Sequence, residues 1–326
     1  MKTRFDYRNL VLALTGLIIL VAAGCKKDEN DSLPVITTSP VTYIDEQSVF
    51  VEGVVTDDGG AAVTTTGICW STSHNPTTAN DKIMGSGPVS FTCMLGGLTT
   101  NTQYYVRAYA INSVGTAYGP EISFRTWNAE MVTDIDGNVY HTVTIGTQIW
   151  LVENLNVTHY RNGDAIAWIP DNPEWEGLTT GAYCDYENDA GNSATYGRLY
   201  NWFAVNDDRN IAPVSWHVST DDDWTVLADY LGGNATAGGK LKEAGFTHWL
   251  EPNSEATNET GFSALPGGFR DYGGYFDYIK WGGGWWTSTE ENPNDAWIRY
   301  LDHGAFDVWR ALEDKRYGRS VRCVKD

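Results

Sequence analysis

Short apolar runs, separated by turn residues at intervals of about ten positions, characterise residues 33–127. Residues 49–55 and 65–71 are rich in β-branched side chains; an Asp-Asp-Gly-Gly turn follows the first run, and Asn75-Pro76 stops the second. Such runs favour strands, and Gly, Asp, Asn and Pro favour the turns between them. The pattern therefore predicts a β-sandwich in this part of the chain.

From residue 131 the pattern predicts strands mixed with loops and helices. Asp136-Gly137 indicates a hairpin turn between strands at 131–133 and 139–145, and residues 148–155 are predicted as a further buried strand. The alternative for the Asp-rich turn is a calcium loop, but the acidic residue that closes such a loop is not found at its spacing. The hairpin is therefore preferred.

Two segments have the apolar spacing of amphipathic helices. Residues 196–205 would place Leu199, Trp202 and Phe203 on one side. A second helix is predicted after Ser219-Thr220, because these hydroxyls can cap it and the acids at 221–223 favour the positive end of its dipole. Gly232-Gly233 is predicted to end this helix. Its predicted buried stripe is Trp224, Leu227, Ala228 and Leu231.

The N-terminus is typical of an exported protein. A basic region precedes an apolar stretch at 11–24, which has the length of a signal sequence rather than a membrane span. Ala22-Ala23-Gly24-Cys25 resembles the bacterial lipobox, with Ala22 where Leu is usual. We expect a signal peptide at 1–24, a lipidated Cys25 and a flexible tether at 25–32. The charged residues 26–31 resemble the export tag of Bacteroidetes surface lipoproteins, which implies an outer-membrane, cell-surface location; the alternative is a plain solvated tether.

Two resemblances to known families follow from the residues. Residues 98–112 resemble the corner tyrosine and the next strand of fibronectin type III domains, so 33–127 is expected to be such a domain. Seven ordered motifs between residue 131 and the end resemble the Fibrobacter succinogenes major paralogous domain, assigned to 128–326. This resemblance implies a secreted or surface domain without a defined biochemical role. The motifs are DGNVY (136–140), WLVENL (150–155), GRLYNW (197–202), WHVS (216–219), GFSALPGG (261–268), WTSTE (286–290) and SVRCV (320–324).

The same motifs are similar, more loosely, to the C-type-lectin-like fold, a mixed α+β and loop-rich architecture that includes formylglycine-generating enzymes. Those enzymes need two active cysteines near the C-terminal end, and here only Cys323 lies there, with Cys184 far upstream. The resemblance therefore predicts a structural disulfide between Cys184 and Cys323 rather than catalysis. Cys69 and Cys93 fall on predicted strands and either pair or remain buried thiols.

Metal sites are not predicted. Glu251-Pro252-Asn253 resembles a tripeptide of calcium-dependent lectins and Asn294-Asp295 follows downstream, but further oxygen ligands cannot be placed. The histidines, including His141 and His217, have no zinc-ligand spacing. We therefore expect no cofactor, with calcium as the alternative.

Charge and tryptophan content narrow the class of partner. The net charge of -20 and the pI near 4.5 argue against nucleic acid, which requires clustered Lys and Arg. Twelve of the fourteen tryptophans lie at Trp150 or later, which marks a domain boundary near the middle of the chain.

Residues 269–285 are the predicted ligand-binding surface, because aromatic rings alternate there with glycines outside the recurring motifs. Phe262, Leu265 and Trp286, which lie within those motifs, are predicted to be core. The sequence thus predicts a surface-anchored, non-catalytic binding protein for an extracellular glycan or protein. The alternatives are a structural or fimbria-like assembly component, or an unrecognised enzyme on the formylglycine-generating-enzyme-like fold. The candidate binding residues are Arg270, Tyr272, Tyr275, Tyr278, Trp281 and Trp285.

Overall fold

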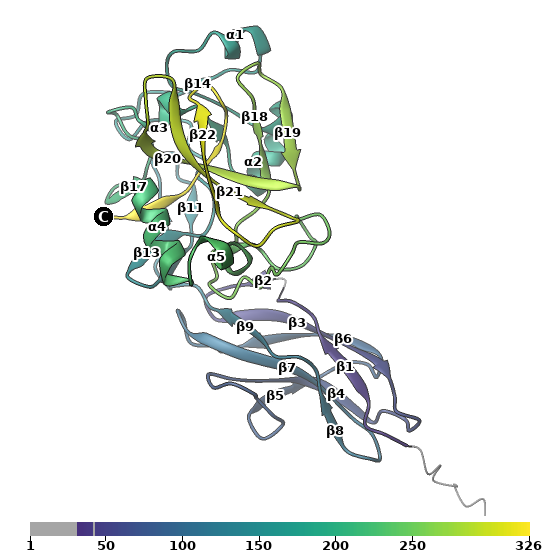
Figure 1. The fold of residues 1–326 in the computed structure, drawn as a ribbon. Helices are drawn as coiled ribbons and strands as arrows, with labels where there is room; N and C mark the ends of the chain where they lie inside the picture. Colours follow the sequence, from purple (N-terminus) through teal and green to yellow (C-terminus); the bar gives the residue numbers. More distant parts are fainter. Residues whose placement is uncertain (1–30, 42) are drawn as a thin grey trace, which may run out of the picture.

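The computed structural model describes residues 31–41 and 43–326, which form two domains placed end to end (Figure 1). The predicted signal peptide and the predicted lipidation site Cys25 lie outside the described residues. Within the part of the chain that is described, no helix is both long and apolar enough to cross a membrane.

The first domain is a β-sandwich, as the sequence predicts, and we call it the sandwich domain. Its two sheets lie face to face (Figure 1). The runs predicted at 49–55 and 65–71 are the strands β3 and β4. One sheet contains β1 (Val35–Thr38), β2 (Tyr43–Ile44), β3 (Ser48–Asp57) and β6 (Ser90–Gly96). The other contains β4 (Thr65–Ser71), β5 (Asp81–Met84), β7 (Gln103–Ile111), β8 (Thr116–Tyr118) and β9 (Ile122–Arg125).

Alternate residues of these strands face each other and form one core. Val49, Val51 and Ile68 are almost fully buried in it. The predicted corner tyrosine is confirmed, since the Tyr104 hydroxyl accepts a hydrogen bond from the backbone N–H of Thr99 at 3.0 Å. This bond fixes the chain where it enters β7, as in other sandwiches of this kind.

The second domain, which we call the terminal domain, contains a six-stranded sheet and smaller sheets. The predicted hairpin is confirmed by the pairing of β10 (Val132–Thr133) with β11 (Val139–Tyr140). The six-stranded sheet runs β19 (Phe276–Ile279), β18 (Gly267–Arg270), β20 (Gly282–Glu290), β21 (Asp295–Asp302), β22 (Trp309–Asp314), with β23 (Ser320–Val321) beside β20. A four-stranded sheet runs β12 (Thr142–Ile145), β13 (Gln148–Leu151), β24 (Cys323–Lys325), β17 (Trp216–Val218). A three-stranded sheet contains β14 (Ala167–Trp168), β15 (Ala182–Cys184) and β16 (Leu199–Tyr200).

The helix predicted after Thr220 is confirmed. Thr220 and Asp223 form a reciprocal capping box, and Gly232 and Gly233 follow the helix with φ of 100° and 96°. Trp224 is fully buried in the predicted stripe. The helical segments are α1 (Asn172–Glu176), the 3₁₀ turn η1 (Tyr186–Asn188), α2 (Ala190–Tyr196), α3 (Trp202–Val205), α4 (Asp221–Tyr230) and α5 (Asn234–Leu241).

The helix predicted at 196–205 is wrong as a single element. The chain leaves α2 at Gly197, where φ is 73° and an added Cβ would lie 2.7 Å from the Cβ of Asn154. It then pairs as β16 with β15 before Asn201 caps the short helix α3. The helical spacing of the apolar residues therefore arose from a strand followed by a single turn.

The predicted disulfide between Cys184 and Cys323 is not formed, and Cys69 and Cys93 follow the alternative of buried thiols: all four cysteines are free and buried. Cys184 packs beside Trp175, whereas Cys323 belongs to a different cluster that contains Trp286. Burial raises the pKa of both the Cys184 and Cys323 thiols to about 12. Each acts as a small apolar core residue.

Candidate functional site

A groove of about 670 Å³ opens on one face of the six-stranded sheet, within the size range of small-molecule sites. Its position follows from the strand pairing, because Tyr300 on β21 lies opposite Trp309 on β22. Residues two apart on a strand share a face, so both strands contribute alternate side chains. The residues that line this groove are Phe269, Tyr278, Ile298, Tyr300, Asp302, Gly304, Ala305, Trp309, Ala311, Glu313, Tyr317 and Arg319.

Aromatic rings in contact with one another form the walls of the groove. The rings of Phe269 and Tyr278 stack with their centroids 5.5 Å apart, and Tyr278 meets Tyr300 edge to face at 6.4 Å. Tyr317 packs against Phe269 at 5.8 Å. Such contacts hold the rings at fixed orientations. Trp309 stands on the edge strand β22 and is 55% exposed.

Two glycines of β20 make room for the side chains that cross the sheet. A Cβ at Gly282 would lie 2.3 Å from the hydroxyl of Tyr300, and one at Gly284 would lie 2.6 Å from Nη1 of Arg319. Because these glycines have no side chains, the side chains of Tyr300 and Arg319 pack directly against the backbone of β20. The glycine run of this segment thus sets the depth of the groove.

A charged pair lies at the base of the groove. Arg319 is only 4% exposed; its Nε donates to Glu313 at 2.6 Å, and its Nη2 also donates to that carboxylate. The guanidinium lies 4.4 Å from the centroid of Phe269. A two-pronged Arg–carboxylate pair of this kind is rigid. Nη1 of Arg319 is buried without a hydrogen-bond partner in the part of the chain that the structure describes.

A second polar group lies at Asp302. Its carboxylate accepts hydrogen bonds from the Tyr300 hydroxyl at 3.0 Å and from the backbone N–H of Gly304 at 2.7 Å. Burial and the neighbouring Asp302 raise the pKa of Tyr300, which keeps its hydroxyl protonated as a donor. The groove therefore combines apolar ring surface with a few oriented polar groups.

The structure separates the six predicted binding residues into four sets: one in the groove lining, one beside it, two exposed elsewhere and two in the core. Tyr278 lines the groove. Tyr272 lies beside the groove, because the centroid of its ring is 6.0 Å from that of Tyr317, which is part of the lining. Tyr275 and Trp281 are exposed but lie outside the groove lining, and Trp281 packs edge-on against His303.

Trp285 and Arg270 are core residues, and their prediction as ligand contacts is wrong. Trp285 is fully buried because it alternates with Gly284 along β20 and so points away from the groove; its Nε1 donates to Asn154 Oδ1 at 2.7 Å. Arg270 is also fully buried and donates to the backbone oxygens of Ile169 and Pro170. It fixes the loop that leads into α1.

Most groove residues were missed because they come from residues 298–319, beyond the predicted segment. The period of two along each strand was a signal for this surface. Ile298, Tyr300 and Asp302 share one face of β21, and Trp309 and Glu313 share one face of β22. Periodicity within each strand does not show that the two strands pair. The pairing register was needed to bring the two sets together.

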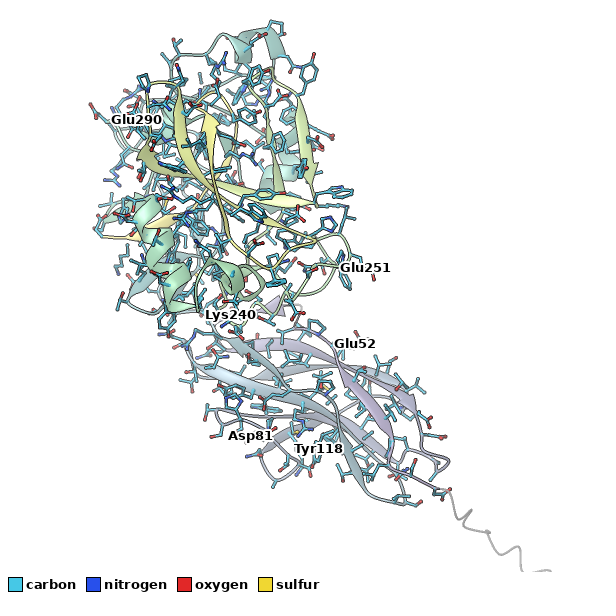
Figure 2. All side chains as sticks on the ribbon, in the orientation of Figure 1. Glu52, Asp81, Tyr118, Lys240, Glu251 and Glu290 are labelled. Atoms are coloured by element: carbon cyan, nitrogen blue, oxygen red, sulfur yellow. The ribbon has the colours of Figure 1, made fainter. Side chains whose placement is uncertain are left out.

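The possible calcium ligands are not brought together. Glu251 lies beside the end of β21, because its carbonyl oxygen is 3.1 Å from Nδ1 of His303. Asn294-Asp295 lies at the start of β21, on the side of Glu290, and Figure 2 shows Glu251 and Glu290 far apart. Asn253 is buried and donates to backbone oxygens. These residues do not form one coordination shell.

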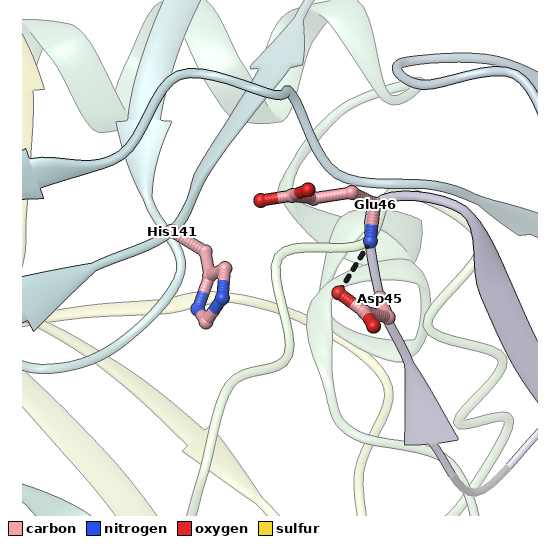
Figure 3. Close-up of side chains that lie close together, drawn as sticks. All are labelled: Asp45, Glu46 and His141. Carbon is pink, nitrogen blue, oxygen red and sulfur yellow. Dashed lines mark hydrogen bonds between the residues drawn. The ribbon is translucent and has the colours of Figure 1, made fainter.

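Side chains of the type that bind metal ions do converge elsewhere, at the junction between the domains. Asp45 and Glu46 lie in the turn between β2 and β3, and His141 lies between β11 and β12 (Figure 3). One ligand atom from each lies within 4.8 Å of the other two. The hydrogen bond from His141 to Glu153, more than the nearby Asp45 and Glu46, raises the pKa of the imidazole.

A family model and several solved structures are each similar to part of this chain. The family model described as Fibrobacter succinogenes major domain matches residues 143–325. The sensor domain of the anti-sigma factor RsgI4 of Pseudobacteroides cellulosolvens is 18% identical, with 30% of this chain and 78% of that chain covered and a TM-score of 0.24. The third fibronectin III domain of human KIAA0343 protein is 17% identical, with coverages of 33% and 95% and a TM-score of 0.23. No curated protein matches the sequence.

Proposed function

The chain belongs to the Fibrobacter succinogenes major domain family, and from this premise we propose that the terminal domain is a non-catalytic module that binds an extracellular glycan in its groove. The observation that carries the proposal is the combination of fixed aromatic walls with the buried Arg319–Glu313 pair. Sugar rings have apolar C–H faces that pack on aromatic rings, while their hydroxyls need oriented donors and acceptors.

The charge of the groove favours a neutral glycan. Its lining contains the carboxylates of Asp302 and Glu313 but only one guanidinium, that of Arg319, which is already paired. An anionic polysaccharide would be repelled both by the carboxylates of the groove and by the net charge of -20. Asp302 can accept hydrogen bonds from sugar hydroxyls. The Arg319–Glu313 pair holds the aromatic wall at Phe269, against which the sugar ring would pack.

Titration of the purified protein with neutral oligosaccharides, preceded by a glycan array, tests the proposal. Trp309→Ala and Tyr278→Ala should each weaken binding by more than about tenfold, equivalent to about 1.4 kcal/mol. Trp168→Ala is the matched control, because Trp168 is exposed to 49% on β14, outside the groove lining. All three variants should keep nearly the wild-type Tm.

Tyr275→Ala and Trp281→Ala measure how far the binding surface extends past the groove. If the ligand contacts only the groove, both variants bind like the wild type, whereas a longer glycan that continues over the exposed rings loses affinity in both. Failure to bind any neutral glycan, or equal loss of binding in Trp168→Ala and Trp309→Ala, would overturn the proposal.

We also propose that the terminal domain has a C-type-lectin-like fold and that the protein is a lipoprotein on the outer surface of the outer membrane. The ordered motifs support the fold, and the lipobox-like sequence before Cys25 supports the anchor. Incorporation of labelled palmitate that is lost in Cys25→Ser tests the anchor. Loss of the protein on protease treatment of intact cells tests surface exposure, and full protection would contradict it.

A further inference from the structure

We propose that Asp45, Glu46 and His141 bind one divalent transition-metal ion that links the sandwich domain to the terminal domain. The two carboxylates belong to the sandwich domain and the imidazole to the terminal domain (Figure 3). Their ligand atoms already lie within 4.8 Å of one another. Four-coordinate zinc with bonds of about 2.0–2.1 Å needs ligand atoms about 3.3 Å apart, so side-chain adjustments of about 1 Å would close the site.

The donor set suits such an ion. One imidazole nitrogen with two carboxylate oxygens is a ligand combination that Zn²⁺ accepts, with water in the remaining position. The imidazole makes calcium a poorer match, since calcium prefers an all-oxygen shell.

A carboxylate from the terminal domain holds the imidazole of His141. Its Nδ1 lies 2.6 Å from Oε1 of Glu153, and Oε2 of the same carboxylate accepts from the His141 backbone N–H at 2.8 Å. A carboxylate on Nδ1 keeps the proton there and leaves the lone pair on Nε2 for a metal. The ring of Trp127 packs against the imidazole with the centroids 4.5 Å apart and restricts its rotation.

Among the residues that the structure describes, no lysine or arginine forms an ion pair with Asp45 or Glu46. Oε1 of Glu46 is buried and has no hydrogen-bond partner among residues 31–41 and 43–326. Asp45 accepts from the backbone N–H of Glu46 at 2.7 Å and from the Ser48 hydroxyl at 3.4 Å. Of Asp45, Glu46 and His141, only His141 forms an ion pair within the described residues, and its partner is Glu153. A buried, unpartnered carboxylate oxygen is costly unless a cation or a donor meets it.

The junction gives the ion a structural role. The backbone N–H of Trp127 donates to the backbone carbonyl oxygen of Asp45 at 3.4 Å, and the indole Nε1 of Trp127 donates to the carbonyl oxygen of Gly261 at 3.0 Å. These bonds hold the linker to both domains. A metal bound by ligands from both domains would therefore stabilise one relative orientation of the two.

The test measures metal content and binding on the purified full-length protein after treatment with a chelator. Zn²⁺ is the probe for stoichiometry, and Co²⁺ adds visible absorption bands that report direct coordination. The wild type should bind about one Zn²⁺ per chain. Glu46→Gln keeps the size of the side chain, so it tests the site without a large risk to folding; it should weaken binding by more than about tenfold, as should His141→Gln.

The matched control is His159→Gln. Nδ1 of His159 lies 2.6 Å from Oδ1 of Asp136, in the same kind of histidine–carboxylate pair. His159 is not part of the group formed by Asp45, Glu46 and His141. This variant should bind Zn²⁺ like the wild type. A wild type that retains no Zn²⁺ would overturn the proposal. Equal affinity in the wild type and Glu46→Gln would overturn it as well.

Discussion

Gly284→Ala tests whether the glycines of β20 are required by the groove. The new Cβ would lie 2.6 Å from Nη1 of Arg319 and 3.2 Å from its Cζ, well inside ordinary contact. Arg319 cannot swing away easily, because it is 4% exposed and bonded twice to Glu313. Gly284 has no positive φ, so the substitution adds crowding without backbone strain.

The expected loss of stability follows from these contacts. Relief of the overlap requires either an overpacked core, at about 1–3 kcal/mol, or a broken charge-assisted hydrogen bond, at about 1.5–3 kcal/mol. Alanine also lowers the conformational entropy of the unfolded chain, which stabilises the folded state by about 0.4–1 kcal/mol. Gly284→Ala should therefore destabilise the terminal domain by about 1–2 kcal/mol.

Denaturant unfolding followed by tryptophan fluorescence is the appropriate assay, because twelve of the fourteen tryptophans lie at Trp150 or later and report on the terminal domain. Gly96→Ala on β6 is the control, since a Cβ there would have no atom of the described residues within 4 Å. It should leave this transition unchanged. If Gly284→Ala were as stable as the wild type, Arg319 would not be fixed on the strand as described, and the argument for a rigid groove would fail.

Three further predictions concern groups outside the groove. Although burial opposes the shift, hydrogen bonds from His217 and Thr220 lower the pKa of Asp223 to about 2; this carboxylate therefore adds stability above its unfolded pKa of about 3.9, which is lost as the pH falls towards 2. Thermal unfolding of Asp223→Asn should show a smaller loss of Tm between pH 5 and 2 than the wild type, and an identical pH dependence would contradict this assignment. Tyr104→Phe removes the acceptor for the Thr99 N–H and should destabilise the sandwich domain by about 1 kcal/mol in denaturant unfolding followed by circular dichroism, whereas an unchanged midpoint would show that the bond contributes nothing. Alkylation after denaturation without reductant, read by mass spectrometry, should modify every one of Cys69, Cys93, Cys184 and Cys323, and protection of any pair would reveal a disulfide.

Local features of the fold were predictable because their causes are local. The cap at Thr220, the apolar stripe that includes Trp224, and the turn at Gly137 depend on residues a few positions apart. The helix predicted at 196–205 failed for a related reason. Leu199 and Trp202 have helical spacing, but the backbone required at Gly197 and the pairing of β16 with β15 depend on residues 154 and 182–184.

The candidate site was only partly predictable. The sequence indicated the aromatic segment and Tyr278, but it could not show that alternation along β20 turns Trp285 into the core while Gly284 faces the groove. Arg270 likewise resembled a polar ligand contact until its bonds to backbone oxygens about one hundred positions away were visible.

The sequence by itself determined the order of the two domains, the family of the second and the strand periods, because motifs, turn residues and side-chain alternation are written along the chain. The tertiary structure alone decided which strands pair and in what register, and therefore placed Tyr300 and Trp309 in one groove. It also decided that Asp45 and Glu46 meet His141 across the domain junction. These contacts depend on how distant segments pack, and no spacing within a single segment encodes them.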